Sequence, residues 1–152
     1  MKTEFYKLLS ENDDFCKTLG KVMLAASKLE IELKQYLRLH GEDVSEKRAT
    51  LGNLIQLLKK NGHLTRNGEM HFGQINLQRN YLVHNLYASF VGEIEDWLLP
   101  IDDLVPEDVE VYVEKTEQTA EGFEIYSKIV CEALNKMTEN SEPDTGKVAP
   151  LL

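Results

Sequence analysis

The chain has 152 residues, 42% of them hydrophobic and 28% charged, which fits a single soluble domain. Its longest apolar run, residues 22–26, is far too short to cross a membrane, and its acidic start has no apolar signal region, so we expect a cytoplasmic protein. The net charge of −9 argues against a nucleic-acid partner. However, residues 1–90 carry a net +3 (13 Lys and Arg, 10 Asp and Glu) and residues 91–152 a net −12 (4 and 16). The acidic half is therefore either an ordinary solvated surface, or it repels polyanions and leaves only the mildly basic half to bind them.

Apolar residues alternate at spacings of four and three from Phe15 to Tyr36, which predicts a long amphipathic helix over residues 13–39. Asn12 or Asp13 is expected to cap its start. A shorter helix is expected at 51–60.

Thr50 is the expected N-cap of that shorter helix. Residues 63–69 contain a second Asn-Gly pair and are expected to form a turn or loop. A third helix is predicted from near Met70 to about Phe90, because Gly92 breaks the pattern beyond it.

A fourth helix is predicted from near Pro106, with four-three spacing continuing to Met137. Residues 138–152 have no periodicity and are expected to be a disordered acidic and polar tail. No strand alternation occurs along the chain. The prediction is one all-α domain over residues 1–137, an antiparallel bundle of about four helices with two long and two shorter ones.

Cys16 and Cys131 each lie within an apolar helical pattern. Without an export signal, they are expected to be reduced core thiols rather than a disulfide.

Arg79 interrupts the apolar face of the third predicted helix. With Arg79 at zero on a helical wheel, Phe72 lies at about 20° and Leu86 at about −20°, so the arginine is in the middle of that face. A polar stripe lies beside it, at angles of about 60° to 140°, and comprises Asn76, Tyr87, Asn80 and His84.

A guanidinium on a core face is costly unless it is paired or reaches a cleft. Arg79 therefore either extends to the edge of the bundle and pairs with a carboxylate of the first long helix, Glu30 or Glu32, or serves as a functional cation.

The stretch RNYLVHN, from Arg79 to Asn85, resembles the R-polar-xxx-H motif of the HEPN family, with Asn80 as the polar residue and His84 as the histidine. The segment TLGNLIQLLKK, residues 50–60, looks like the short helix that precedes the motif in some bacterial members. The resemblance covers about the first 95 residues.

The resemblance implies a homodimer in which two motifs face each other across a cleft, and a metal-independent endoribonuclease of toxin–antitoxin or phage-defence type, without a cofactor. His84 would transfer protons near neutral pH, and Arg79 would stabilise the charge that develops on the phosphate. Asn80 would orient the imidazole or hold a phosphate oxygen. The expected substrate-binding residues are Tyr87, Asn76 and Tyr81.

Some toxin members carry a tyrosine two residues after the histidine, where a nucleotidyltransferase antitoxin can modify it; here Tyr87 follows His84 by three. Tyr87 would stack on an RNA base or pack against a neighbouring helix. The alternative function is a non-catalytic HEPN-like module that binds a nucleotide, RNA or a protein partner, or that forms a structural dimer.

Overall fold

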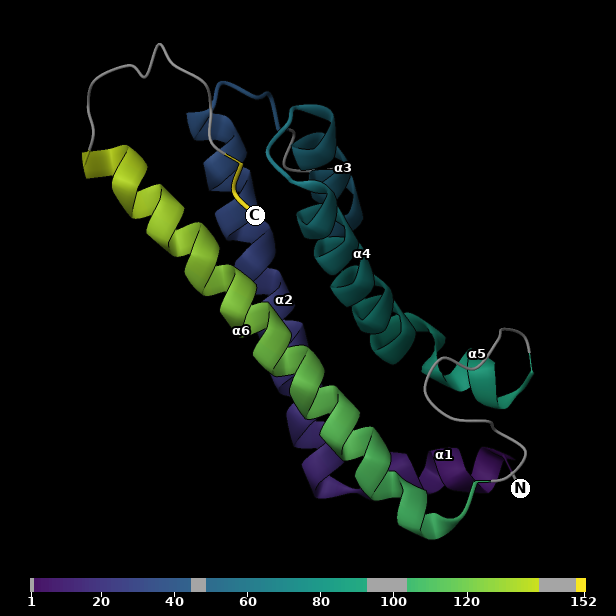
Figure 1. Ribbon diagram of the computed structural model, residues 1–152. Helices are drawn as coiled ribbons and strands as arrows, with labels where there is room; N and C mark the ends of the chain where they lie inside the picture. Colours follow the sequence, from purple (N-terminus) through teal and green to yellow (C-terminus); the bar gives the residue numbers. More distant parts are fainter. Residues whose placement is uncertain (1, 45–48, 93–103, 140–149) are drawn as a thin grey trace.

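The computed structural model describes residues 2–44, 49–92, 104–139 and 150–152. Within these ranges all regular structure is helical, which confirms the predicted all-α class. None of the described helices is long and apolar enough to span a bilayer. In chain order the elements are α1 (Lys2–Glu11), α2 (Asp13–Leu39), α3 (Leu51–Lys60), α4 (Arg66–Asn80), the π-helical turn η1 (Tyr81–Asn85), α5 (Leu86–Phe90), the 3₁₀ turn η3 (Pro106–Asp108) and α6 (Val109–Glu139) (Figure 1).

The two longest helices, α2 and α6, lie side by side and run parallel (Figure 1). Lys28 contacts Ser127 and Glu32 contacts Cys131, so the residue offset stays constant along the pair. The expectation of an antiparallel arrangement is therefore wrong for these two helices. They can be parallel because the intervening chain, which includes α3 and α4, returns to the end of the molecule at which α2 begins.

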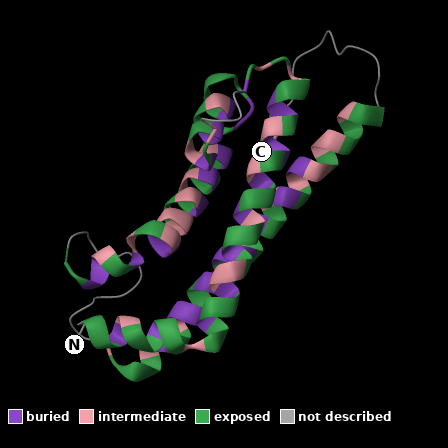
Figure 2. Ribbon diagram, turned by 180° about the vertical axis from the view of Figure 1, so that it is seen from behind, coloured by how far each residue is buried: buried purple, intermediate pink, exposed green. Residues whose placement is uncertain are grey.

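Helix α4 runs antiparallel to both long helices. Its Arg79 pairs with Glu30 of α2, whereas His63, just before α4, bonds Tyr36 further along α2. Phe72 of α4 stacks on Tyr126 of α6 with ring centroids 4.9 Å apart. Buried positions recur along each of these helices and alternate with exposed ones (Figure 2).

The starts of α2 and α3 follow from their capping residues. Asn12 accepts a hydrogen bond from Phe15 N at 2.8 Å, which satisfies an otherwise unpaired amide of the first turn. Thr50 does the same for Asn53 N at 3.3 Å.

Helix α4 starts at Arg66, four residues before the predicted position near Met70. Thr65 caps it by accepting a hydrogen bond from Gly68 N at 3.1 Å. Residues 66–69 are therefore helical, and the prediction that they form a turn or loop is wrong, because the threonine cap outweighs the low helix propensity of the Asn67–Gly68 pair.

Helix α1 has no counterpart among the predicted elements. Its Phe5 and Leu9 are buried, and the Phe5 ring lies 5.7 Å from Phe90 of α5 and 5.4 Å from Tyr112 of α6, measured between centroids. The helix therefore closes the end of the bundle at which the motif-bearing segment arrives.

Both cysteines are free thiols. Cys16 is exposed, so the expectation that it is a core thiol is wrong: Phe15 and Thr18 take the buried positions of the first turns of α2. Cys131 is half-buried. The disorder predicted for the tail falls mostly on residues 140–149, which lie outside the described residues, whereas α6 continues to Glu139 and Leu151 and Leu152 pack against the core.

Candidate functional site

The helix that carries the motif changes its winding within the motif. After α4 ends at Asn80, the chain forms the π-helical turn Tyr81–Asn85 and then returns to α-helix. Asn85 has φ −112° and ψ −2°, well away from ideal α-helical values. Single π-helical turns inside α-helices are rare and occur frequently at functional sites.

The π-helical turn changes the geometry predicted from a regular helical wheel. Its backbone pairs residues five apart, so each residue advances around the axis by less than in an α-helix. Arg79 and His84 are five residues apart, and most of the turn lies between them. His84 is therefore rotated towards the side of Arg79, compared with the separation of about 140° that a regular α-helix would impose.

Arg79 lies at the boundary between α4 and α2. One terminal nitrogen, Nη1, donates a hydrogen bond to Asn80 Oδ1 at 3.0 Å, and Nη2 lies 3.7 Å from Glu30 Oε1. The side chains of Arg79 and Glu30 remain 23% and 22% exposed, so solvent reaches the pair. Of the two carboxylates considered from the sequence, the structure pairs Arg79 with Glu30.

Glu30 also has a second role. Its Oε1 accepts a hydrogen bond from Leu51 N at 3.1 Å, at the start of α3. A carboxylate at a helix N-terminus is favourable because the first amides have no partner within the helix. Glu30 therefore links α2 both to the predicted short helix and to the motif arginine.

His84 is exposed, and within the described ranges it makes no hydrogen bond or ion pair. The Asn80 side-chain oxygen faces Arg79. In this state Asn80 orients the guanidinium. An exposed imidazole can accept a proton directly from a bound molecule or donate one to it.

The other predicted site residues lie in different surroundings. Asn76 is half-buried with its side-chain nitrogen close to Gly52 of α3, and none of the described residues donates to its buried Oδ1. Tyr81 is buried, and its hydroxyl lies 3.1 Å from Ser89 Oγ. Because Ser89 donates its own proton to Leu86 O at 2.7 Å, Tyr81 is the donor to Ser89.

Tyr87 is 52% exposed, and its ring lies edge to face with that of Tyr6 of α1, with centroids 4.9 Å apart. It therefore makes a packing contact and remains about half accessible to solvent. The structure thus places Arg79, Asn80, His84 and Tyr87 where solvent reaches them, and it places Tyr81 in the core.

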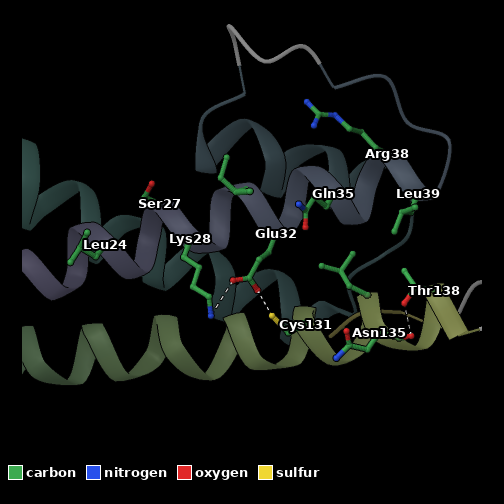
Figure 3. A pocket seen from close by; sticks show the side chains of 12 residues that line it. Leu24, Ser27, Lys28, Glu32, Gln35, Arg38, Leu39, Cys131, Asn135 and Thr138 are labelled. Carbon is green, nitrogen blue, oxygen red and sulfur yellow. Dashed lines mark hydrogen bonds and ion pairs between the residues drawn. The ribbon is translucent and has the colours of Figure 1, made fainter.

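A hollow of about 1,020 Å³ lies between α2 and α6 and contains none of these residues (Figure 3). Its floor holds the buried carboxylate of Glu32, which accepts hydrogen bonds from Ser127 Oγ at 2.7 Å and Cys131 Sγ at 2.9 Å. Lys28 Nζ lies 3.5 Å from the same carboxylate. The sequence did not reveal this cluster, because its members come from two helices about a hundred positions apart.

The Glu32 carboxylate raises the pKa of the Cys131 thiol, first because the thiol donates a hydrogen bond to it, and further through partial burial and negative charge. The thiolate is the reactive form. At pH 8 we expect iodoacetamide to label exposed Cys16 before Cys131, as measured by peptide mass spectrometry over time. Glu32→Gln should accelerate labelling of Cys131 and leave Cys16 unchanged; equal rates for Cys131 in the two proteins would contradict the role of Glu32.

Comparisons with known proteins give no support for an assignment: no family model, curated protein or solved structure matches the chain.

Proposed function

We propose that this chain is a HEPN-like, metal-independent endoribonuclease that acts as a homodimer, of the kind used in toxin–antitoxin or phage-defence systems. The observation that carries the proposal is the π-helical turn at residues 81–85, within the motif of Arg79, Asn80 and His84. It rotates an exposed histidine towards a partly exposed arginine, and such turns concentrate at functional sites.

The chemistry that fits these side chains is cleavage of RNA through its own 2′-hydroxyl group. The 2′-oxygen loses its proton to a base and attacks the adjacent phosphorus, and the bond from phosphorus to the 5′-oxygen breaks as that oxygen gains a proton. The products are a 2′,3′-cyclic phosphate and a free 5′-hydroxyl. His84 suits the proton transfers because an exposed imidazole nitrogen can take the proton from the 2′-oxygen and can donate one to the leaving 5′-oxygen.

Arg79 would stabilise the negative charge that develops on the phosphate oxygens during this reaction. A guanidinium presents a planar fork of donors that matches two phosphate oxygens. The bound phosphate would displace Glu30, whose oxygen keeps its hydrogen bond from Leu51 N. Asn80 already contacts Arg79 and would hold the guanidinium in place.

The direct test is to incubate the purified full chain with a mixture of structured and single-stranded RNAs in the presence of EDTA. We expect cleavage that leaves 2′,3′-cyclic phosphate ends, from a species that light scattering identifies as a dimer. A stable dimer that cuts no RNA in the set would contradict the proposal.

The second candidate function is a non-catalytic HEPN-like module. The ion pair between Arg79 and Glu30 favours it. In that case Arg79 would serve to join α4 to α2, and its removal would reduce stability rather than activity. The geometry of the pair limits this role, because the separation is 3.7 Å and both side chains are about one-fifth exposed.

A double-mutant cycle separates the two roles of Arg79. We expect Arg79→Ala and Glu30→Gln to couple by less than about 1 kcal/mol in urea unfolding, because partly exposed pairs are screened by solvent. Glu30→Gln keeps an oxygen for Leu51 N and so isolates the charge. A coupling free energy above roughly 2 kcal/mol would assign Arg79 to stability and favour the non-catalytic module.

A further inference from the structure

The segment Pro150–Leu152 lies against the loop that joins α3 to α4. Leu151 N donates a hydrogen bond to His63 O, and Thr65 N donates one to Leu152 O, both at 2.6 Å. Leu151 and Leu152 are half-buried and pack against the core. The C-terminal end of the chain, yellow in Figure 1, accordingly lies beside the end of the molecule where α4 begins.

Gly68 shapes the surface on which Leu152 lies. A side-chain carbon added at Gly68 would overlap the main-chain oxygen of Leu152 and come within 3.4 Å of its Cβ. Gly68 is buried, and Thr65 receives its amide hydrogen bond. The first turn of α4 therefore has a notch that admits a peptide main chain only because residue 68 has no side chain.

Two consecutive buried side chains anchor the loop under this segment. The His63 side chain is buried, with its Nδ1 3.2 Å from the Tyr36 hydroxyl and its ring 4.6 Å from that of His40. Leu64, the next residue, is also buried. A binding surface that is fixed in advance loses little conformational entropy when a peptide docks.

We infer that the notch formed by residues 63–68 is a peptide-binding site for a non-helical segment with two consecutive leucines, and that Pro150–Leu152 is its resident ligand. The main-chain hydrogen bonds to His63 and Thr65 supply affinity without reading side chains, and the half-buried leucines supply the apolar contacts. A partner protein that presents a segment of this chemistry would dock here by displacing the chain's own residues. This inference does not depend on the proposed ribonuclease activity.

The resident segment should compete with any added peptide. A tethered ligand acts at an effective concentration on the order of millimolar. The full chain should therefore bind a peptide of residues 147–152 at least about tenfold more weakly than a Leu151→Asp/Leu152→Asp chain, whose own segment cannot dock.

Two glycines of α4 provide a matched test. In Gly68→Ala the new methyl group blocks the notch, whereas in Gly73→Ala it meets no atom within 4 Å. Both changes raise helix propensity by a similar amount. Both glycines lie inside the same helix, so neither variant should fail to fold.

The experiment follows the Thr65 amide signal by ¹⁵N NMR during titration with the peptide of residues 147–152. In the Leu151→Asp/Leu152→Asp chain we expect a saturable shift, which survives an added Gly73→Ala and disappears with an added Gly68→Ala. The same peptide with serine in place of both leucines should give no shift. The inference is overturned if the Thr65 signal does not respond to the leucine peptide, or if Gly68→Ala leaves the response intact.

Discussion

Replacing His84 with alanine is expected to slow RNA cleavage by roughly a hundredfold to ten-thousandfold, the usual contribution of a general acid or base. His84 is exposed and makes no hydrogen bond within the described ranges, so the change should leave the unfolding midpoint nearly unaltered. Initial rates on a single-stranded RNA in EDTA, measured at matched dimer concentration, give the size of the loss.

His71 is the matched control for this substitution. It is an exposed histidine on α4, eight residues before Arg79. His71→Ala should cleave RNA at the rate of the unmodified chain. Equal losses in the two variants would mean that both histidines act by attracting RNA and not by transferring protons. No loss in either variant would mean that His84 takes no part in the reaction.

Replacing Arg79 should slow RNA cleavage by a factor comparable to that for His84, but for a different reason. Arg79→Ala removes the group that faces the developing phosphate charge, at a cost of about 10²–10³ in rate. Arg79→Lys keeps the charge but loses the planar fork, so it should recover only part of the activity. The Arg66→Ala control, an exposed arginine at the start of α4, should retain full activity.

Much of the fold follows from local sequence signals. The four-three spacing between Phe15 and Tyr36 predicts α2 with its observed bounds, and Thr50 marks the start of α3. These elements were predictable because apolar periodicity and side-chain caps act within a few residues. The first four residues of α4 fall outside the predicted helix because the Asn67–Gly68 pair indicates a turn, whereas in the structure Thr65 caps the helix at this point.

The relative directions of the helices did not follow from such signals. The parallel arrangement of α2 and α6 depends on where the chain between them turns, and no periodicity within either helix encodes that path. Helix α1 was missed because it has ten residues, of which Phe5 and Leu9 are buried, too few to define a helical period.

The candidate site was predictable in its residues but not in its winding. A wheel at a constant 100° per residue identifies Arg79 as misplaced on an apolar face. The cost of burying a guanidinium then predicts pairing with Glu30 or Glu32 as one explanation, and the structure shows Glu30. The wheel cannot anticipate the π-helical turn at Tyr81–Asn85, because it assumes α-helical winding throughout. In the structure Tyr81 lies in the core and is bonded to Ser89, although the sequence suggested contact with substrate.

The packing of α4 on α6 makes Phe72 a residue whose loss should cost much stability. Phe72 is fully buried and stacks on Tyr126 across the two helices. Phe72→Ala should lower the free energy of unfolding by about 3–5 kcal/mol, because it removes buried area and leaves a cavity. In a chain of this length the melting temperature should fall by roughly 6–20 °C.

Met70, two residues earlier on α4, is 63% exposed, so Met70→Ala should change the unfolding free energy by less than about 0.5 kcal/mol. Urea unfolding followed by circular dichroism compares the two variants under the same conditions. Phe72 lies two turns before Arg79, so its packing fixes the position of α4 on α6 and not the conformation of the motif. Phe72→Ala should therefore keep RNA cleavage well below its melting temperature, and a stability loss under about 1 kcal/mol would contradict the packing of α4 on α6.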